Sequence, residues 1–410
     1  MSRIIIIGAS HAGLACAERL RHHGFSGKIT IFDREKGLPL QRPPLSKTYL
    51  SAQEGASEEA YLLRKAEWFE GFDIDFQPSC EIISIDRKAG VIKLADGRRE
   101  AYSELVIATG AMPRHLPILG GDAKGVFVLR VAREARAIRA HMGKAGKAVV
   151  IGGGYIGLEA AAVASGMGMS VHVLEAAPRL LARVAEPEIS SFYTRLHKDH
   201  GVTLVTESQM TGFVGDGAVS GVEMADGSII EADIVITGIG ILPNVELAEA
   251  AGLDVDNGIV VNELGQTSDP HIFAAGDCTS HPNDLLGRTM RLESVPNAIE
   301  QGKAVASAIC GAPKPYHQVP WFWSDQYDVK LQIAGVPTQI DNKVLRGDDA
   351  SNSFAWFYFT GDKLTGVTAV NRPAEFMAGR MLIEKSLKGE VTADPAKLAD
   401  EDMKPKEWLA

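Results

Sequence analysis

The sequence predicts an α/β fold made of two parallel-sheet units followed by a small α+β unit. Two short apolar runs rich in β-branched residues, Arg3–Ile7 and Lys147–Ile151, each lead into a glycine-rich turn, a helical stretch and another short strand. A glycine turn binds a dinucleotide in this context, because the turn and the helix N-terminus present backbone N–H groups to a pyrophosphate. Two such contexts in one chain predict two Rossmann-like dinucleotide-binding domains.

Length, composition and charge exclude several classes of protein. A chain of 410 residues suggests two or three domains, and 45% hydrophobic with 23% charged residues is ordinary for a globular protein. The formal net charge of −10 argues against nucleic acid as a main partner. No 18-residue apolar run is present, and the N-terminus leads directly into the first glycine turn, so we expect a cytoplasmic protein without a membrane segment. The four cysteines lack short spacings, so no disulfide framework or metal site is expected.

The first glycine turn runs from Gly8 to Gly13 and includes Ser10 and Ala12. A helix is expected over 14–23 and a strand over 28–32, and Asp33 follows that strand, 25 positions after Gly8. A carboxylate at that spacing binds the ribose of a dinucleotide. Ser10 replaces the usual middle glycine, but it is small enough for a pyrophosphate to approach. A tight turn without a ligand is the alternative interpretation.

The second glycine turn, from Gly152 to Gly157, matches the full G-x-G-x-x-G pattern. Glu175 ends the next strand, 23 positions after Gly152. A terminal Glu can accept both ribose hydroxyls and repels the extra phosphate of NADP, so NADH is predicted. The candidate contacts in this unit are Gly152, Gly154, Ile156, Gly157 and Glu175. Arg179 and Arg183 could hold a phosphate group or could belong to a solvated surface.

Three later strands also close on glycines. The first ends at Thr109 and Gly110, and the second repeats this plan at Gly238, so one unit looks inserted into another of the same design. The third ends in Gly276 and Asp277. Its carboxylate could bind the hydroxyls of a sugar-like chain, or it could simply cap a helix.

Together these elements resemble the FAD-dependent pyridine-nucleotide reductases, which have a glutathione-reductase-like fold with two dinucleotide-binding domains. The resemblance implies FAD at the first glycine turn, NADH at the second, and an FAD site completed by Gly276 and Asp277. It also implies four segments. They are 1–113 and 241–317 for the FAD domain, 114–240 for the NAD domain and 318–410 for a C-terminal α+β interface domain.

The segment after the first unit separates this chain from thiol-dependent relatives. Disulfide reductases and NADH oxidases of this superfamily carry cysteine there, whereas residues 41–47 read Gln-Arg-Pro-Pro-Leu-Ser-Lys. That run is similar to the oxygenase-coupled ferredoxin reductases, as are residues 151–159, 293–298, 320–326 and 371–373. The resemblance covers nearly the whole chain, and the Trp-Phe-Trp-Ser-Asp-Gln stretch is quite specific to it.

The resemblance implies roles for individual residues. Lys47 would lie beside the flavin ring and pair with Glu159 near the nicotinamide. The other implied cofactor contacts are Arg42, Ile82, Thr109, Gly110, Arg130, Gly238, Val295 and Trp323. The alternatives are a surface position for Lys47 and a core position for Trp323.

The expected activity is hydride transfer from NADH to FAD, followed by single-electron transfer to a 2Fe–2S ferredoxin that feeds a haem-thiolate monooxygenase or a dioxygenase. Arg288, Arg291 and Lys303 are candidate basic contacts for the ferredoxin, and a monomer or weak dimer is expected. The alternatives are a rubredoxin reductase, an NADH oxidase or an apoptosis-inducing-factor-like signalling flavoprotein. In the C-terminal unit we expect strands over 356–360 and 364–370, a helix over 374–388 and a loosely held tail over 394–410.

Overall fold

The computed structural model describes residues 2–52 and 55–409, and its first sheet is parallel with the strand order β19-β7-β1-β2-β3. The strands are β1 (Arg3–Ile7), β2 (Lys28–Phe32), β3 (Ile74–Gln77), β7 (Glu104–Ile107) and β19 (Ile272–Ala274). Helices α1 (His11–His22) and α7 (Val295–Ile309) pack closely, since a Cβ on Gly302 would lie 2.3 Å from the carbonyl oxygen of Ala12. The sheet therefore joins the start of the chain to a segment beyond residue 270.

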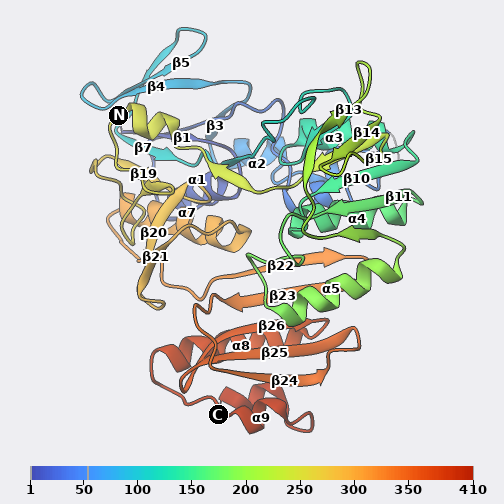
Figure 1. The fold of residues 1–410 in the computed structure, drawn as a ribbon. Helices are drawn as coiled ribbons and strands as arrows, with labels where there is room; N and C mark the ends of the chain where they lie inside the picture. The colour runs from blue at the N-terminus through green and yellow to red at the C-terminus, as the bar shows by residue number, and fades with distance from the viewer. Residues whose placement is uncertain (1, 53–54, 410) are drawn as a thin grey trace.

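The second sheet is also parallel, with the order β12-β11-β10-β16-β9, and repeats the design of the first. Its strands are β9 (Val126–Val128), β10 (Lys147–Ile151), β11 (Ser170–Leu174), β12 (Thr203–Val205) and β16 (Ile234–Thr237). The helices are α3 (Ala132–Met142), α4 (Tyr155–Gly166) and α5 (Pro187–Asp199). In Figure 1 the two parallel-sheet units form the two upper lobes, and the C-terminal unit lies below both.

The C-terminal unit is an antiparallel sheet with the order β22-β23-β26-β25-β24. Its strands are β22 (Trp321–Gln326), β23 (Val329–Gly335), β24 (Asn342–Asp348), β25 (Ser353–Thr360) and β26 (Lys363–Val370). Helix α8 (Pro373–Leu387) packs on this sheet. Phe354 of β25 meets Phe192 of α5 edge to face at 5.2 Å, so one apolar core continues from the second unit into the C-terminal unit.

The predicted loose tail over 394–410 is wrong for the part of it that the structure describes. Helix α9 (Pro395–Ala399) and the 3₁₀ helix η3 (Pro405–Leu409) pack on the C-terminal unit and bury Leu398 and Trp408. Charged residues dominate the composition of this segment, but these two apolar side chains anchor it.

Smaller elements connect the sheets. Strands β8 (Ala111–Pro113) and β17 (Ile241–Pro243) pair with each other where the chain leaves the first unit and returns to it. The remaining strands are β4 (Ile82–Asp86), β5 (Val91–Leu94), β6 (Arg99–Ala101), β13 (Met210–Val214), β14 (Gly221–Met224), β15 (Ile229–Glu231), β18 (Ile259–Val260), β20 (Thr279–Asn283) and β21 (Arg288–Met290). The remaining helices are η1 (Pro43–Ser46), η2 (Glu58–Tyr61), α2 (Ala66–Gly71) and α6 (Glu246–Ala250).

Within the described residues, every helix is too short or too polar to cross a membrane. The sequence predicted the central strands of both parallel sheets closely but not β3, β9 and β12, and it placed the start of the first helix at residue 14, three residues late. Ser10 has an extended backbone (φ −102°, ψ −162°), and α1 begins at the next residue. The glycine turn therefore passes directly into the helix, and the first helical N–H groups lie at the turn itself.

Candidate functional site

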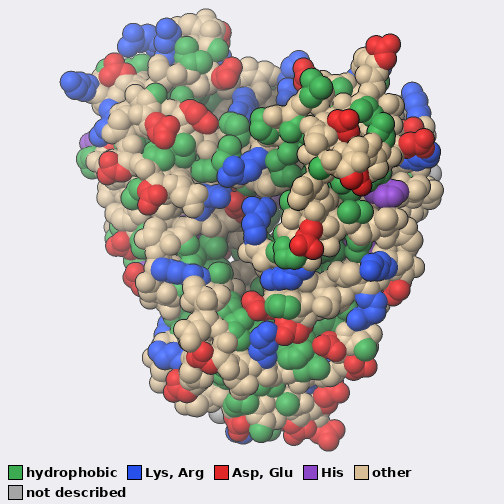
Figure 2. All heavy atoms as spheres, viewed as in Figure 1, with side chains coloured by type: hydrophobic (Ala, Val, Ile, Leu, Met, Phe, Trp, Pro, Cys, Tyr) green, Lys and Arg blue, Asp and Glu red, His purple; other side chains and the backbone are tan. Residues whose placement is uncertain are grey.

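One cavity of about 1670 Å³ lies between the two parallel-sheet units and the C-terminal sheet. Both glycine turns, η1, and parts of β22 and β23 line it. A pocket for a single small ligand holds about 300–1,000 Å³, so this volume suits more than one small molecule or a large cofactor with a second ligand. Figure 2 shows Lys and Arg side chains along the sides of the hollow at the centre of this face.

The first glycine turn forms one end of the cavity. Gly8 has a φ of +110°, and a Cβ there would lie 2.3 Å from the carbonyl oxygen of Ala108, so only glycine fits. Asp33 at the end of β2 accepts hydrogen bonds from the backbone N–H of Ala9 at 2.6 Å and of Glu35 at 2.7 Å. The carboxylate thus lies against the turn, where it can also accept hydroxyls of a ribose.

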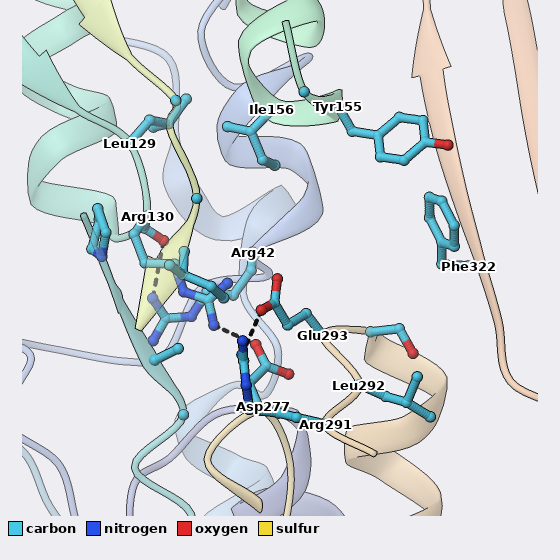
Figure 3. A pocket seen from close by; sticks show the side chains of 18 of the residues that line it. Arg42, Leu129, Arg130, Tyr155, Ile156, Asp277, Arg291, Leu292, Glu293 and Phe322 are labelled. Carbon is cyan, nitrogen blue, oxygen red and sulfur yellow. Dashed lines mark hydrogen bonds and ion pairs between the residues drawn. The ribbon is translucent and has the colours of Figure 1, made fainter. Parts of the chain in front are cut away.

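Arg42 and Arg130 form a cationic pair at the same end of the cavity, near His11 (Figure 3). Arg42 donates to the carbonyl oxygen of Arg130 at 3.0 Å, and Arg130 pairs with Asp277 at 2.6 Å. Burial in the cavity lowers the pKa of Arg42 to about 10, so the guanidinium keeps its charge at neutral pH. Among the described residues Arg42 forms no ion pair, which is costly for a charge in such a place. A half-buried guanidinium near His11, at the start of helix α1, fits the pyrophosphate of a dinucleotide.

The return segment after β19 brings Gly276 and Asp277 to the same end of the cavity. Gln301 of α7 accepts a hydrogen bond from the backbone N–H of Gly276 at 2.7 Å and from the hydroxyl of Thr279 at 3.0 Å. These two bonds fix the turn, and Gly276 adopts a φ of +89° that favours glycine. The Asp277 carboxylate is therefore held beside the α1 turn by residues that lie far from it in the sequence.

His11 also lines this end of the cavity. Burial lowers its pKa to about 4, with a smaller contribution from the nearby Arg42 cation. The imidazole is therefore neutral at physiological pH and adds no charge to the cationic pair.

The second glycine turn forms the other end. A Cβ on Gly152 would lie 2.6 Å from the carbonyl oxygen of Gly238, and a Cβ on Gly157 would lie 2.1 Å from that of Gly152. Glu175 accepts hydrogen bonds from the backbone N–H of Gly153 and of Ala177, both at 2.7 Å. The arrangement repeats that of Asp33 at the first turn, so the two ends of the cavity are built alike.

The two arginines near Glu175 have different surroundings. Arg179 donates to the carbonyl oxygens of Ala182 and Ala185 and to the hydroxyl of Ser190, so its guanidinium holds the following loop together. Both arginines line the cavity, and the Arg183 guanidinium lies beside Gly240. Of the two, Arg183 has the guanidinium placed to meet a ligand.

Lys47 and Glu159 meet near the middle of the cavity. The Lys47 ammonium lies 2.9 Å from a Glu159 carboxylate oxygen, and the side chains are 15% and 3% exposed. Ser46 donates to one oxygen of Glu159 at 2.5 Å and Ser324 to the other at 2.6 Å. Burial raises the pKa of Glu159, and Lys47 and the two hydroxyls oppose that rise. The Glu159 carboxylate of α4 is therefore contacted by Ser46 of η1, by Lys47 directly after it and by Ser324 of β22.

The structure places nearly all the predicted site residues around this one cavity. The residues that line the cavity are Gly8, Ser10, Ala12, Asp33, Arg42, Lys47, Ile82, Thr109, Gly110, Arg130, Gly152, Gly154, Ile156, Glu159, Glu175, Arg183, Gly238, Gly276, Asp277, Val295 and Trp323. Gly13 and Gly157 lie behind the two turns, where they pack against Gly8 and Gly152 and leave no room for a Cβ.

Three buried polar residues of the site were missed by the sequence analysis. Ser46 and Ser324 lie inside the two motifs quoted for the resemblance, yet neither was assigned a role. Gln301 lies in an Ala-rich helix and gave no local sign of its contacts. A small polar residue at an inward position of an apolar strand, as at Ser324, was the available signal.

The three basic residues predicted to contact a ferredoxin do not form one group in the structure. Arg291 lines the cavity and pairs with Glu293 at 2.5 Å, and Arg288 donates to the carbonyl oxygen of Val336 at 2.7 Å. Lys303 lies on an exposed turn of α7 and pairs with Glu300 at 2.7 Å. Only Lys303 of these three is both exposed and outside the cavity wall.

Two protein-family models match the chain. A model described as pyridine nucleotide-disulphide oxidoreductase matches residues 2–302, and one described as reductase C-terminal matches residues 321–409. Rhodocoxin reductase of Rhodococcus erythropolis is 42% identical over 400 residues, which cover 97% of this chain and 92% of that protein.

Two solved structures are similar along the full length. The covalent putidaredoxin reductase–putidaredoxin complex matches with a TM-score of 0.94 and 40% identity, covering 100% of this chain and 98% of the other. The ferredoxin reductase for the CYP199A2 system from Rhodopseudomonas palustris matches with a TM-score of 0.95 and 40% identity, covering 100% of both chains.

Proposed function

The chain belongs to the pyridine nucleotide-disulphide oxidoreductase family, and we propose on that basis that it is an NADH-dependent ferredoxin reductase that binds FAD. The observation that carries the proposal is the placement of the Lys47–Glu159 pair between two glycine turns that face one cavity. Such a cavity can hold two dinucleotides end to end, with their reactive rings meeting at the pair.

The FAD half of the cavity is formed by the first turn, the cationic pair and the return segment. Arg42 would neutralise the pyrophosphate, Asp33 would bind the adenosine ribose and Asp277 the hydroxyl-bearing chain next to the flavin. When bound, FAD supplies the redox chemistry, because its ring can take two electrons from NADH and return them one at a time. We assign 1–113 and 241–317 to this domain, 114–240 to the NADH domain and 318–410 to the interface domain.

The NADH half is formed by the second turn and Glu175. The carboxylate of Glu175 already accepts two backbone N–H bonds, so it is fixed in place at the ribose position. A phosphate on that ribose would meet a negative charge it cannot displace, and NADPH should therefore bind poorly.

The Lys47–Glu159 pair would serve both rings. The Lys47 ammonium would offset negative charge gained by the flavin, because an opposite charge counts heavily in a site with little water. Glu159 holds Lys47 in place through the 2.9 Å ion pair. Besides Cys80, which lies beside Asp33, no cysteine of the described residues lines the cavity, and thiol chemistry at the pair is not proposed.

The acceptor in this proposal is a 2Fe–2S ferredoxin that feeds a haem-thiolate monooxygenase or a dioxygenase. The similar structures support it, since one holds putidaredoxin bound to its reductase and the other serves the CYP199A2 system. Trp323 lies at the cavity wall on β22. An acidic ferredoxin would need a local basic contact on this acidic chain, and Lys303 is the exposed candidate.

Charge reversal tests the ferredoxin contact. Lys303→Glu should raise the apparent Michaelis constant for ferredoxin several-fold and leave NADH–ferricyanide activity intact, because a rim charge acts on encounter. Lys388→Glu is a matched control, since Lys388 at the end of α8 is similarly exposed and also pairs with a nearby glutamate, Glu384. Equal loss of both activities in Lys303→Glu, or the same rise in the control, would remove Lys303 from the contact.

Steady-state assays test the proposed function against its alternatives. NADH oxidation should be slow with oxygen alone and fast with a 2Fe–2S ferredoxin plus cytochrome c, and NADPH should support little of it. A rubredoxin that replaces the ferredoxin at an equal rate would favour a rubredoxin reductase. An oxygen-dependent rate equal to the coupled rate would favour an NADH oxidase, and the absence of any NADH oxidation would favour a signalling flavoprotein.

A further inference from the structure

A hydrogen-bonded chain leads away from Glu159 into the interior, on the side opposite Lys47. Gln326 of β22 donates to the hydroxyl oxygen of Ser324 at 3.2 Å. The Gln326 carbonyl oxygen lies 2.8 Å from His197 Nε2, and the hydroxyl of Tyr327 lies 3.1 Å from His197 Nδ1. Because Ser324 itself donates to Glu159 at 2.6 Å, the chain is continuous from Tyr327 to the carboxylate.

The donor at every step of this chain points toward Glu159. A carboxylate only accepts, so the Ser324 hydroxyl must donate to it and accept from the Gln326 amide. The amide carbonyl also only accepts, so His197 carries its proton on Nε2. His197 Nδ1 is then an acceptor, and Tyr327 donates to it. Hydrogen bonds in one direction strengthen one another, so the whole chain favours the ionised carboxylate.

The middle of the chain is buried and lies outside the cavity. Ser324, Gln326 and His197 are 0%, 1% and 0% exposed, and none of them lines the cavity wall. They cannot touch FAD or NADH in the proposed sites. Their contacts instead connect α5 of the second unit to β22 of the C-terminal unit, and through Glu159 to Lys47, the residue after η1.

We propose that Ser324, Gln326 and His197 are positioning residues that keep Glu159 ionised and oriented toward the nicotinamide site. This inference rests on the proposed function, because it assigns the carboxylate a ligand. The nicotinamide ring of NAD⁺ carries a positive charge, so an ionised Glu159 attracts it and a protonated Glu159 does not.

The charged and titratable groups around the chain are few. Lys47 is the cation that faces Glu159, and the phenols nearby are Tyr155 of α4 and Tyr193 of α5. Burial raises the pKa of both phenols, so they stay neutral. His197 faces His200 and Tyr327, and burial lowers the pKa of His197 to about 4, so it is a neutral donor and acceptor at physiological pH.

The test is the dissociation constant of NAD⁺ for the oxidised FAD-loaded protein, measured by titration from pH 6 to pH 9. The wild-type constant should stay nearly flat. Gln326→Leu removes the donor to Ser324, and His197→Leu removes the donor that fixes the Gln326 amide. In both variants the Ser324 hydroxyl is held less firmly toward Glu159, so the pKa of Glu159 rises. Binding should then weaken toward pH 6, by roughly tenfold for each unit by which the pKa rises above 6, and recover toward pH 9. His197→Gln keeps a donor for Gln326 and should restore a flat profile.

Phe354→Leu is the matched control, because it loosens the same α5 contact without touching the chain. It should lower the melting temperature and leave the pH profile flat. Flat profiles in both chain variants, or the same pH dependence in Phe354→Leu, would overturn the positioning role while NAD⁺ binding by the wild type upholds the proposed function. No NAD⁺ binding by the wild type would overturn both.

Discussion

Lys47 and Glu159 carry opposite charges in a place from which water is largely excluded. Their side chains are 15% and 3% exposed, and three donors reach the carboxylate. Removing one partner of a buried pair leaves the other charge uncompensated, which typically costs about 3–5 kcal/mol. The pair is therefore a site where one substitution should change both the electrostatics and the local stability.

Lys47→Met should slow the reduction of bound flavin by NADH at least roughly tenfold, since a barrier increase of about 1.4 kcal/mol has that effect. Rapid-mixing absorbance of the flavin under anaerobic conditions measures the rate. The control is Lys28→Met, which breaks the more exposed Lys28–Asp75 pair on the first sheet and should leave the rate unchanged. A wild-type rate in Lys47→Met would show that the ammonium has no part in the reaction.

Among individual residues, the sequence predicted those whose spacing is fixed by local backbone geometry. Gly8, Gly152, Asp33 and Glu175 follow from the geometry of a strand, a tight turn and a helix. Local geometry does not relate Ser324 to Glu159, because the two residues are 165 positions apart and meet only when the C-terminal sheet packs on α4.

The charged C-terminal segment, residues 395–409, forms ordered helices because buried side chains attach it to the C-terminal unit. Arg346 of β24 is 3% exposed, pairs with Glu375 of α8 and donates to backbone carbonyl oxygens of the segment, including that of Met403 at 2.9 Å. Its guanidinium also lies over the ring of Trp408, 5.3 Å from the centroid. The buried Arg346 cation and the buried Trp408 ring thus stabilise the packing of α9 and η3 on the C-terminal unit.

Trp408→Ala should destabilise the protein by about 3–5 kcal/mol, the usual cost of removing a large buried side chain. The melting temperature measures this loss, and the exposed neighbour Lys406→Ala should show none of it. An unchanged melting temperature in Trp408→Ala would mean that the tail contributes nothing to the fold.

Element boundaries were predictable where hydrophobic runs are short and bounded by glycine, as in β1, β10 and β16. They were not predictable where a mostly polar segment contains only a few buried apolar residues. Residues 395–409 contain several charges, and only the packing of Leu398 and Trp408 on the sheet reveals their structure.

At the scale of the whole molecule, buried histidines contribute to the loss of stability in acid. Burial lowers the pKa of His281 to about 4, as it does for His11 and His197. An unfolded histidine takes up its proton near pH 6.5, so the unfolded state binds more protons between pH 6.5 and 4. The stabilisation is full above pH 6.5 and is lost as the pH falls toward 4.

His281→Leu should reduce this acid sensitivity, because it removes a buried group that must take up a proton in acid. Neither ring nitrogen of His281 has a hydrogen-bond partner within the described residues, so the substitution breaks no hydrogen bond there. The wild type should lose about 2 kcal/mol more than the variant between pH 8 and pH 5. Melting temperatures at the two pH values measure the difference, with the exposed His115→Leu as control. Equal acid sensitivity in His281→Leu and the wild type would contradict the burial of His281 as the cause.

The proposed reaction requires that electrons enter as a pair from NADH and leave singly to a 2Fe–2S protein. An anaerobic titration of a 2Fe–2S ferredoxin with NADH, in the presence of a catalytic amount of this protein, measures that ratio. We predict about two ferredoxins reduced for each NADH consumed, because each cluster accepts one electron. Consumption of NADH without reduction of the cluster would contradict the proposed reaction.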